Sequence, residues 1–340
     1  MGDDLSVKNL VGRTERDAWS TVTGSRPESY RIPEVGLALM EKVDHALFER
    51  DLDRAITAGV VFQKWAEHDP HFRCKAPAVM AAVYAVCGLS TEAEKKLVKA
   101  KDRVRVKRCQ DCEAQYLKRT GTFLFHETRY QDAHSAFSRS RELFLDLGDR
   151  REAGISIMCR GVTAFVLNEY DEALRDHECA LELLGGEFSM YVIIAAINIA
   201  AIYTNLGQVD RALRQIDIAQ EMLQGEGNGE RPRLILHWIR ALLFEAEGKN
   251  KDAGEMLDRV EARMRRHDMK PELRVLLADR ARIARRPGVI RQIARKAHAL
   301  EEIPRIRTLI EAVITAPTRE NVKVWRSALD SYVPPFPATT

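Results

Sequence analysis

The amino-acid sequence predicts an all-α fold, a solenoid in which antiparallel helix pairs stack one after another. Small residues recur along the chain at spacings of 38 to 41, and a companion series of compact residues lies twelve positions before them. One further step reaches Ile293 and Ala281, so the pattern makes seven units. The first series is Ala55, Ala93, Ala133, Ala173, Ala212 and Ala253, and the companion series is Val43, Ala81, Gly121, Gly161, Ala200 and Ala241.

Close packing of two helices accounts for both series. The companion residue lies on the first helix of each pair and the alanine on the second, where the two helices cross. A larger side chain at either position would push the helices apart. One pair cannot bury its apolar face alone, so neighbouring pairs stack and share a core.

The second helix of each pair carries a further periodic face. Four residues after the alanine lies a large residue in most units, and three residues later a smaller one. Offsets of four and three place both on one side of a helix. The large residues are Leu97, Phe137, His177, Ile216 and Leu257, and the smaller ones are Ala100, Ser140, Ala180, Ala219 and Val260.

This pattern resembles the tetratricopeptide repeat, in which a small residue, a turn and an alanine follow one another in the same order. The unit here is nearer 40 residues than the usual length of about 34, as in long-helix variants of the family. The resemblance implies a right-handed superhelical solenoid. It also implies that the first helix of each pair lines a concave groove that binds a protein segment.

The sequence divides into four predicted regions. Residues 1–32 form an N-terminal extension, 33–302 the solenoid, 303–333 two capping helices and 334–340 a disordered tail. The capping helices begin at Pro304 and Thr318, which are good helix-start residues. The helix pairs are expected near 33–67, 74–104, 112–147, 152–184, 191–224, 232–267 and 272–302.

Charge is segregated along the chain, although the net charge is only +3. Eight basic and two acidic residues lie between Glu94 and Arg108, and thirteen basic and four acidic residues between Arg259 and Lys296. Such stretches attract nucleic acid or acidic protein segments, but a solvated basic face is the preferred interpretation. The predicted basic patch comprises Lys95, Lys96, Lys99, Arg103, Arg282, Arg285 and Arg286.

No sequence pattern favours an enzyme, a membrane protein or a secreted protein. Phosphate-binding loops, HExxH and nucleophile motifs are absent, and no apolar run is long enough to cross a membrane. The first residues do not resemble a signal peptide, so we expect a cytoplasmic, non-enzymatic protein without a cofactor.

A zinc site is a further possibility that the sequence raises. Cys109 and Cys112 form a CxxC pair, and His68, His71 and Cys74 lie about one repeat upstream. Cysteine and histidine at such spacings can form tetrahedral zinc sites. There is no second CxxC pair, and the existing pair falls at an expected helix start, where both side chains can simply pack. The expectation is therefore that the protein holds no metal.

Under the resemblance, groove positions can be assigned on the first helices of units three to six. They are mostly apolar, which favours a covering partner. The stretch from Ile197 to Tyr203 is similar to the Asn-Leu-Ala-x-x-Tyr stretch of peptide-binding repeats, which gives Asn198 a role in holding a peptide backbone. The predicted groove residues are Lys118, Arg119, Phe125, Met158, Phe165, Ile194, Asn198, Asn205, Trp238 and Leu242.

Three functions remain open at this point. The first is a protein-interaction scaffold that holds a partner segment in the concave groove. The second is a peptide- or ligand-sensing regulator that acts through a separate effector. The third is a nucleic-acid-associated subunit that uses the basic patch.

Overall fold

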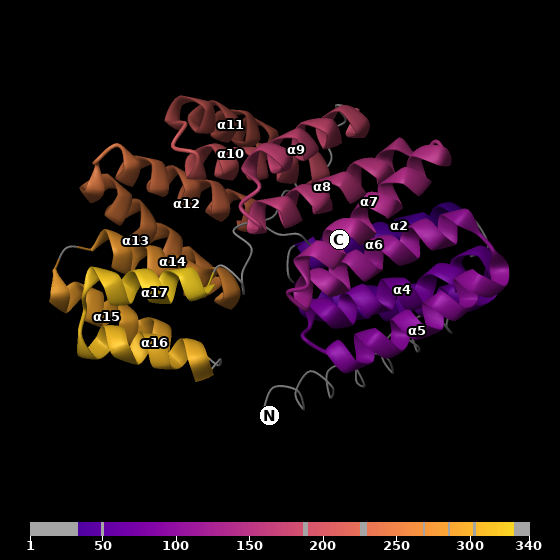
Figure 1. Cartoon of the computed structure of the whole chain (residues 1–340), viewed down its shortest axis with the longest axis horizontal. Coiled ribbons are helices and arrows are strands. Elements are labelled where there is room, and N and C mark those ends of the chain that lie inside the picture. The colour runs from indigo at the N-terminus through magenta and orange to yellow at the C-terminus, as the bar shows by residue number, and fades with distance from the viewer. Residues whose placement is uncertain are drawn as a thin grey trace. The chain divides into compact units, whose positions relative to one another are not determined.

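The computed structural model describes residues 33–48, 51–185, 190–224, 230–267, 269–284, 286–301 and 304–329. The extension expected at 1–32 and the tail expected at 334–340 lie outside these ranges. All regular secondary structure in the described ranges is helical, and consecutive helices pack in antiparallel pairs (Figure 1). The all-α class and the paired architecture predicted from the sequence are confirmed.

Seven helix pairs precede two final helices in the described part of the chain. The turn between the helices of a pair is short in every case, as the repeat requires. The helices are α2 (Pro33–Phe48), α3 (Leu52–Trp65), α4 (Pro70–Val86), α5 (Ser90–Lys107), α6 (Gln110–His126), α7 (Tyr130–Asp146), α8 (Arg150–Val166), α9 (Tyr170–Leu184), α10 (Met190–Asn205), α11 (Val209–Met222), α12 (Glu230–Ala246), α13 (Asn250–Arg266), α14 (Lys270–Ile283), α15 (Pro287–His298), α16 (Pro304–Thr315) and α17 (Arg319–Leu329), with a short 3-10 turn, η2 (Ala66–His68), after α3.

The turns inside pairs two to six each use one left-handed residue. Gly88, Gly207 and Gly248 have positive φ values, and Thr128 and Asn168 occupy the same position in pairs three and four. Glycine adopts this conformation without steric cost, and asparagine tolerates it better than most residues. The turn thus ends the first helix and reverses the chain within three residues.

The small residues of the repeat lie where paired helices approach most closely. A Cβ atom built on Gly121 would lie 2.7 Å from the Phe137 ring, and one on Gly161 would lie 2.9 Å from the Cβ atom of Asp176. Ala133 and Ala173 are the repeat alanines on the second helices of these two pairs, and both are fully buried. The two series therefore report helix-to-helix packing, as the periodicity indicates.

The chain divides into two compact units, Met1–Glu187 and Phe188–Pro337, and each is described by itself. The first unit contains α2 to α9. Its first helix, α2, pairs with α3 and also forms ion pairs with α6 and α8 through Asp44 and Glu41. The first unit is therefore held together by contacts between helices that are distant in sequence as well as by contacts between neighbours.

The second unit contains α10 to α17. Helix α17 packs on α16 and folds back onto α14, and the Trp325 indole ring that it carries is fully buried. One apolar core of this unit runs from Leu234 on α12 to Leu329 on α17, and another joins α10, α11 and α12. No helix in the described ranges is both long and apolar enough to span a lipid bilayer.

Candidate functional site

Two basic groove residues of the first unit, Lys118 and Arg119, are fully buried. The Lys118 Nζ atom lies 2.5 Å from the Glu152 carboxylate. The Arg119 guanidinium donates two hydrogen bonds, of 2.6 and 3.0 Å, to Asp44 on α2. Burial acts to raise the pKa of Asp44, but the charges of Arg119 and Lys118 outweigh it and lower that pKa overall. Both cations are thus committed to contacts within the chain.

The apolar groove residues of the first unit are covered to different degrees. Phe125 and Met158 are buried, and the Phe125 ring meets the Tyr130 ring edge-on with 5.3 Å between centroids. Phe165 is half-buried and lies against Tyr170 with its centroid 5.5 Å away. Of these three side chains, only Phe165 keeps part of its surface open.

In the second unit, Trp238 and Leu242 join the core that α17 completes. The Trp238 indole donates a 3.0 Å hydrogen bond to Asp279 on α14, and Arg326 on α17 donates to the same carboxylate at 2.7 Å. Leu242 packs against that core while remaining partly exposed. This side of α12 is therefore tied to α14 and, through Asp279, to the C-terminal helix.

The two groove asparagines lie on α10 with the buried Ile194. Asn205 is exposed, and its side-chain amide donates to the Ala201 carbonyl of its own helix at 2.9 Å. Asn198 is buried, and neither atom of its amide has a hydrogen-bond partner among the described residues. The peptide-binding role that the sequence predicts for Asn198 stays a prediction.

The basic patch on α5 is only partly free. Lys95 and Lys99 are exposed, whereas the Lys96 Nζ atom lies 2.6 Å from the Gln63 side-chain oxygen. Arg103 donates to the backbone carbonyl of Arg73. The exposed cations of α5 form a solvated helix face.

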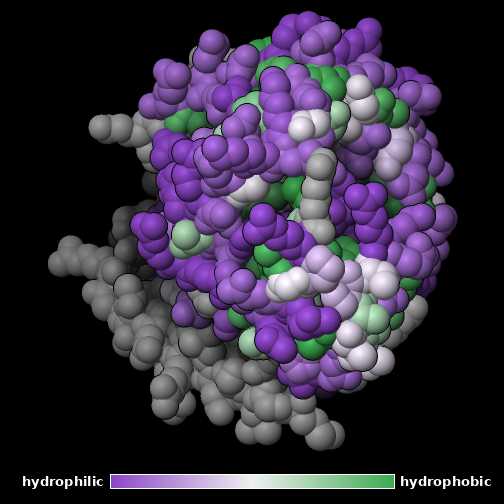
Figure 2. All heavy atoms as spheres, turned by 90° about the vertical axis from the view of Figure 1, so that its left-hand side faces the viewer, coloured by the Kyte–Doolittle hydropathy of each residue, from purple (hydrophilic) through white to green (hydrophobic). Residues whose placement is uncertain are grey.

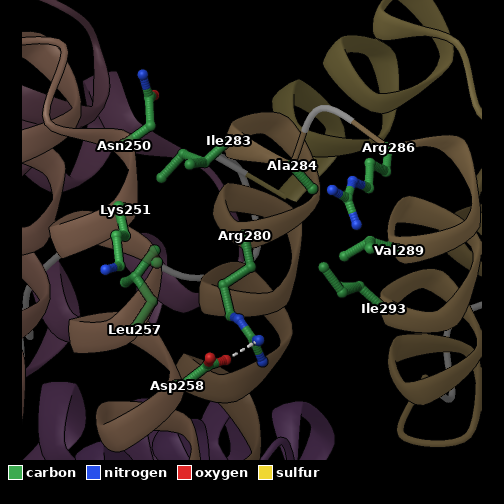
Figure 3. A pocket seen from close by; sticks show the side chains of 11 residues that line it. Asn250, Lys251, Leu257, Asp258, Arg280, Ile283, Ala284, Arg286, Val289 and Ile293 are labelled. Carbon is green, nitrogen blue, oxygen red and sulfur yellow. Dashed lines mark hydrogen bonds and ion pairs between the residues drawn. The ribbon is translucent and has the colours of Figure 1, made fainter.

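The basic residues near α15 have a different setting. Arg282 pairs with Glu245 at 2.7 Å, and Arg285 lies outside the described residues. Arg286 is exposed, and its guanidinium lines a cleft formed by α13, α14 and the start of α15 (Figure 3). This cleft is the site that the structure adds to the sequence analysis.

The cleft has a volume of about 360 Å³ and lies within the second unit. Residues of α13 form one wall and residues of α15 the other, with the end of α14 between them (Figure 3). Gly254 belongs to the α13 wall, and a Cβ atom built on it would meet nothing within 4 Å. The apolar lining is Leu257, Ile283, Ala284, Val289 and Ile293.

Three cations and one carboxylate also line this cleft. Arg280 forms an ion pair with Asp258, which neutralises the carboxylate. Lys251 is exposed, 3.9 Å from Glu255, and Arg286 has no ion-pair partner among the described residues. The result is an apolar surface with two available positive charges on its rim.

A second cleft, of about 380 Å³, lies on another flank of α13 and is lined by Arg259, Arg263 and Arg266 beside apolar residues of α12 and α13. Figure 2 views the molecule from the side on which α13 and α15 lie in Figure 1. Hydrophilic residues cover most of that face, and hydrophobic residues appear between them in small patches. Helix α13 therefore presents basic side chains around two hollows.

Sequence reasoning identified the basic residues of this region but not the cleft. Arg282, Arg285 and Arg286 belong to the predicted patch, while Gly254 and Val289 were not selected. A glycine directly after the Ala253 mark, in the interior of a helix, is the signal that could have found the α13 wall.

No protein-family model matches the sequence, and no curated protein matches it. Solved structures match by fold. BtubC (BKLC) from P. vanneervenii is 19% identical over 68% of this chain and 92% of its own, with a TM-score of 0.51. A tetratricopeptide repeat protein from Parabacteroides merdae is 17% identical over 82% and 97%, also with 0.51. The apo quorum sensor NprR from B. thuringiensis is 11% identical over 96% and 98%, with 0.57.

Proposed function

We propose, from the premise of a tetratricopeptide-type solenoid, that this chain is a non-enzymatic scaffold whose second unit holds a segment of a partner protein. The segment would lie in the cleft of α13, α14 and α15 and present apolar and acidic side chains to it. The observation that carries the proposal is the combination of an apolar lining with Lys251 and Arg286 on the rim.

The physical basis is burial supplemented by charge. Covering the aliphatic side chains of the lining removes apolar surface from water, worth about 25 cal/mol per Å². Arg286 can bind a carboxylate through two parallel hydrogen bonds, which adds direction to the contact. Exposed charge pairs act mainly on the association rate, so added salt should slow binding more than it speeds dissociation.

The concave positions give less support to the same function. Lys118, Arg119 and Trp238 are engaged within the chain, so binding there would require breaking buried ion pairs or a buried hydrogen bond. The cleft on α13 requires no such change. We therefore propose that the partner binds at the cleft and not at the concave positions of α6, α8 and α12.

Nucleic acid fits the cleft less well than an acidic protein segment. No aromatic side chain lines it, and stacking on aromatic rings is the usual way in which unpaired bases are held. Phosphates alone would bind the exposed cations weakly and with steep salt dependence.

The test is selection from a random peptide library displayed on phage, using the immobilised full chain as bait. Peptides that survive counter-selection on the Gly254→Leu chain should be enriched in Asp and Glu beside Leu, Ile or Phe. Leucine at position 254 fills the cleft, and Arg286→Glu reverses its charge; both should abolish capture. Lys101→Glu, at an exposed position on α5, is the matched control and should retain it.

Peptides that bind the Gly254→Leu and Arg286→Glu chains as well as the unmodified chain would contradict this proposal. A band shift of single-stranded DNA or RNA at physiological salt, lost in Arg286→Glu, would favour the nucleic-acid alternative in its place.

A further inference from the structure

Four potential metal ligands occupy the first turns of two parallel helices in the first unit. His71 and Cys74 lie at the start of α4, and Cys109 and Cys112 lie at the start of α6. Each pair has the spacing i, i+3, which places both side chains on one face of its helix. The pairs are 38 residues apart, one repeat, so they occupy equivalent positions on neighbouring first helices.

The packing of α4 against α6 brings these side chains together. The ligand atoms of His71, Cys109 and Cys112 all lie within 4.8 Å of one another. The Cys74 thiol lies outside this group of three but adjoins the Cys112 thiol, so rotation of its side chain can make it the fourth ligand. His68 is not part of the group. The sequence-based expectation that Cys109 and Cys112 only pack does not account for this convergence.

We propose that His71, Cys74, Cys109 and Cys112 form a structural site for one Zn²⁺ ion that joins α4 to α6. Three cysteines and one histidine are a ligand set typical of closed, four-coordinate zinc sites. All six cysteines of the chain are free of disulfide bonds, so these thiols are available as ligands.

The distances fit a site that closes slightly on binding. A Zn–S bond of about 2.3 Å in tetrahedral geometry places two sulfur atoms roughly 3.8 Å apart. Among His71, Cys109 and Cys112 the present spread of up to 4.8 Å requires side-chain movements of about 1 Å. Rotation of the exposed His71 and the half-buried Cys109 can supply them.

Positive charge surrounds the cluster. Cys109 is the N-cap of α6, and its Sγ atom accepts a 3.3 Å hydrogen bond from the backbone N–H of Cys112. Two helix N-termini lie side by side here, and each carries a partial positive charge. Lys107 and Arg103 on α5 bond to backbone carbonyls of the first turn of α4. These charges offset the net negative charge of three thiolates around one divalent cation.

Asp111 orients the histidine ligand. Its carboxylate lies 2.8 Å from the Nε2 atom of His71 and 2.5 Å from the Nζ atom of Lys75. With Nε2 bound to Asp111, the Nδ1 atom is the nitrogen that remains for the metal. A carboxylate that holds the second nitrogen of a histidine ligand is a recurrent feature of zinc sites.

The test is the zinc content of the full chain purified under reducing conditions and dialysed against metal-free buffer. We expect about one zinc per chain, as one closed four-ligand site requires, and loss of that zinc in Cys109→Ser and Cys112→Ser. The matched control is Cys87→Ser, because Cys87 is the C-cap at the opposite end of α4 and should leave the zinc content unchanged.

Titration of the metal-free chain with Co²⁺ covers the case in which a serine variant does not fold. The unmodified chain should show the intense visible absorption of tetrahedral cobalt and a sulfur-to-cobalt charge-transfer band. Cys74→Ser should lower that band by about one third, because one thiolate of three is lost, and His71→Ala should leave its intensity unchanged. Absence of zinc and of cobalt binding in the reduced chain, or zinc retained by Cys109→Ser and Cys112→Ser, would overturn the proposal.

Discussion

Two glycines in helix interiors, Gly161 and Gly254, have opposite surroundings. A Cβ atom on Gly161 would lie 2.9 Å from the Cβ atom of Asp176 and 3.3 Å from the Ala173 carbonyl oxygen, which belongs to the backbone of the facing helix. The equivalent atom on Gly254 would meet nothing within 4 Å. A larger side chain would therefore clash with the facing helix at position 161 but would meet no neighbouring atom at position 254.

Replacing Gly161 with leucine should lower the stability of the chain, and replacing Gly254 with leucine should raise it. Gly161→Leu overpacks the contact of α8 with α9 and should lower the free energy of unfolding by about 1–3 kcal/mol. Gly254→Leu should raise it by up to about 1 kcal/mol, because leucine favours a helix more than glycine does. Urea denaturation of both variants measures the difference. Equal midpoints for the two variants would show that the close contact at Gly161 is misplaced.

His177 occupies the repeat position that Leu97, Phe137, Ile216 and Leu257 fill in other units. It is fully buried, and neither ring nitrogen has a hydrogen-bond partner among the described residues. Burial lowers the pKa of His177 from 6.5 to about 3. The side chain is therefore a neutral imidazole that serves as a core residue.

A pH-dependent loss of stability follows from this burial. Below pH 6.5 the unfolded chain binds a proton at His177 and the folded chain does not until about pH 3, so stability falls as the pH falls through this window. Between pH 7.5 and 5 the loss amounts to about 2 kcal/mol, at 1.36 kcal/mol per unit. His177→Leu should remove this part of the pH dependence and stabilise the chain at both pH values. An identical pH dependence in the variant, measured by denaturation, would contradict the assignment.

Residue periodicity reveals some of these positions and hides others. The small residues at Gly121 and Gly161 could be assigned to close helix contacts from the sequence. Such a contact recurs once per repeat and restricts the size of the side chain each time. The ion pair between Asp44 and Arg119 joins residues 75 apart, nearly two repeats. No local pattern encodes such a contact, so the burial of the groove cations was not predictable.

At the scale of helices, α2 and α17 determine which faces of the first helices stay open. Helix α2 binds α6 and α8 through Asp44 and Glu41, and α17 binds α14 through Arg326. The sequence predicts the final helices as caps from their start signals. It does not predict that Arg326 of α17 and Trp238 of α12 bond to the same carboxylate, that of Asp279. Hydrophobic patterns indicate that a helix exists but not the direction in which it folds back.

The two ion pairs of α2 should differ in energetic weight. Asp44 pairs with Arg119 in full burial, whereas Glu41 and Arg151 are about half exposed. Asp44→Ala removes the carboxylate that accepts two hydrogen bonds from the buried Arg119 guanidinium and should cost about 3–5 kcal/mol of stability. Glu41→Ala, on the same helix, should cost less than about 1 kcal/mol. Calorimetric unfolding of the two variants provides the comparison, and a similar cost for both would mean that α2 does not close against α6.

At the scale of the whole molecule, the solenoid distributes its roles between the two units. The first unit contains the buried ion pairs of Lys118 and Arg119 and carries the proposed zinc ligands. The second carries the clefts on α13, and its C-terminal helix packs on α14, whose Asp279 accepts the hydrogen bond from Trp238 of α12. The fold class was predictable because repeats multiply a weak local signal. The cleft was not, because it arises from the space between three helices and not from any one segment.

The measurement that tests the central claim most directly is hydrogen–deuterium exchange of the full chain with and without a peptide from the library selection. If the partner segment lies in the cleft, added peptide should slow exchange in residues 250–293 and leave α6, α8 and α12 unchanged. The Gly254→Leu chain should show no slowing with the same peptide. Protection that appears in α6, α8 or α12 and persists in the Gly254→Leu chain would place the partner on the first helices of the pairs and contradict the assignment of the cleft.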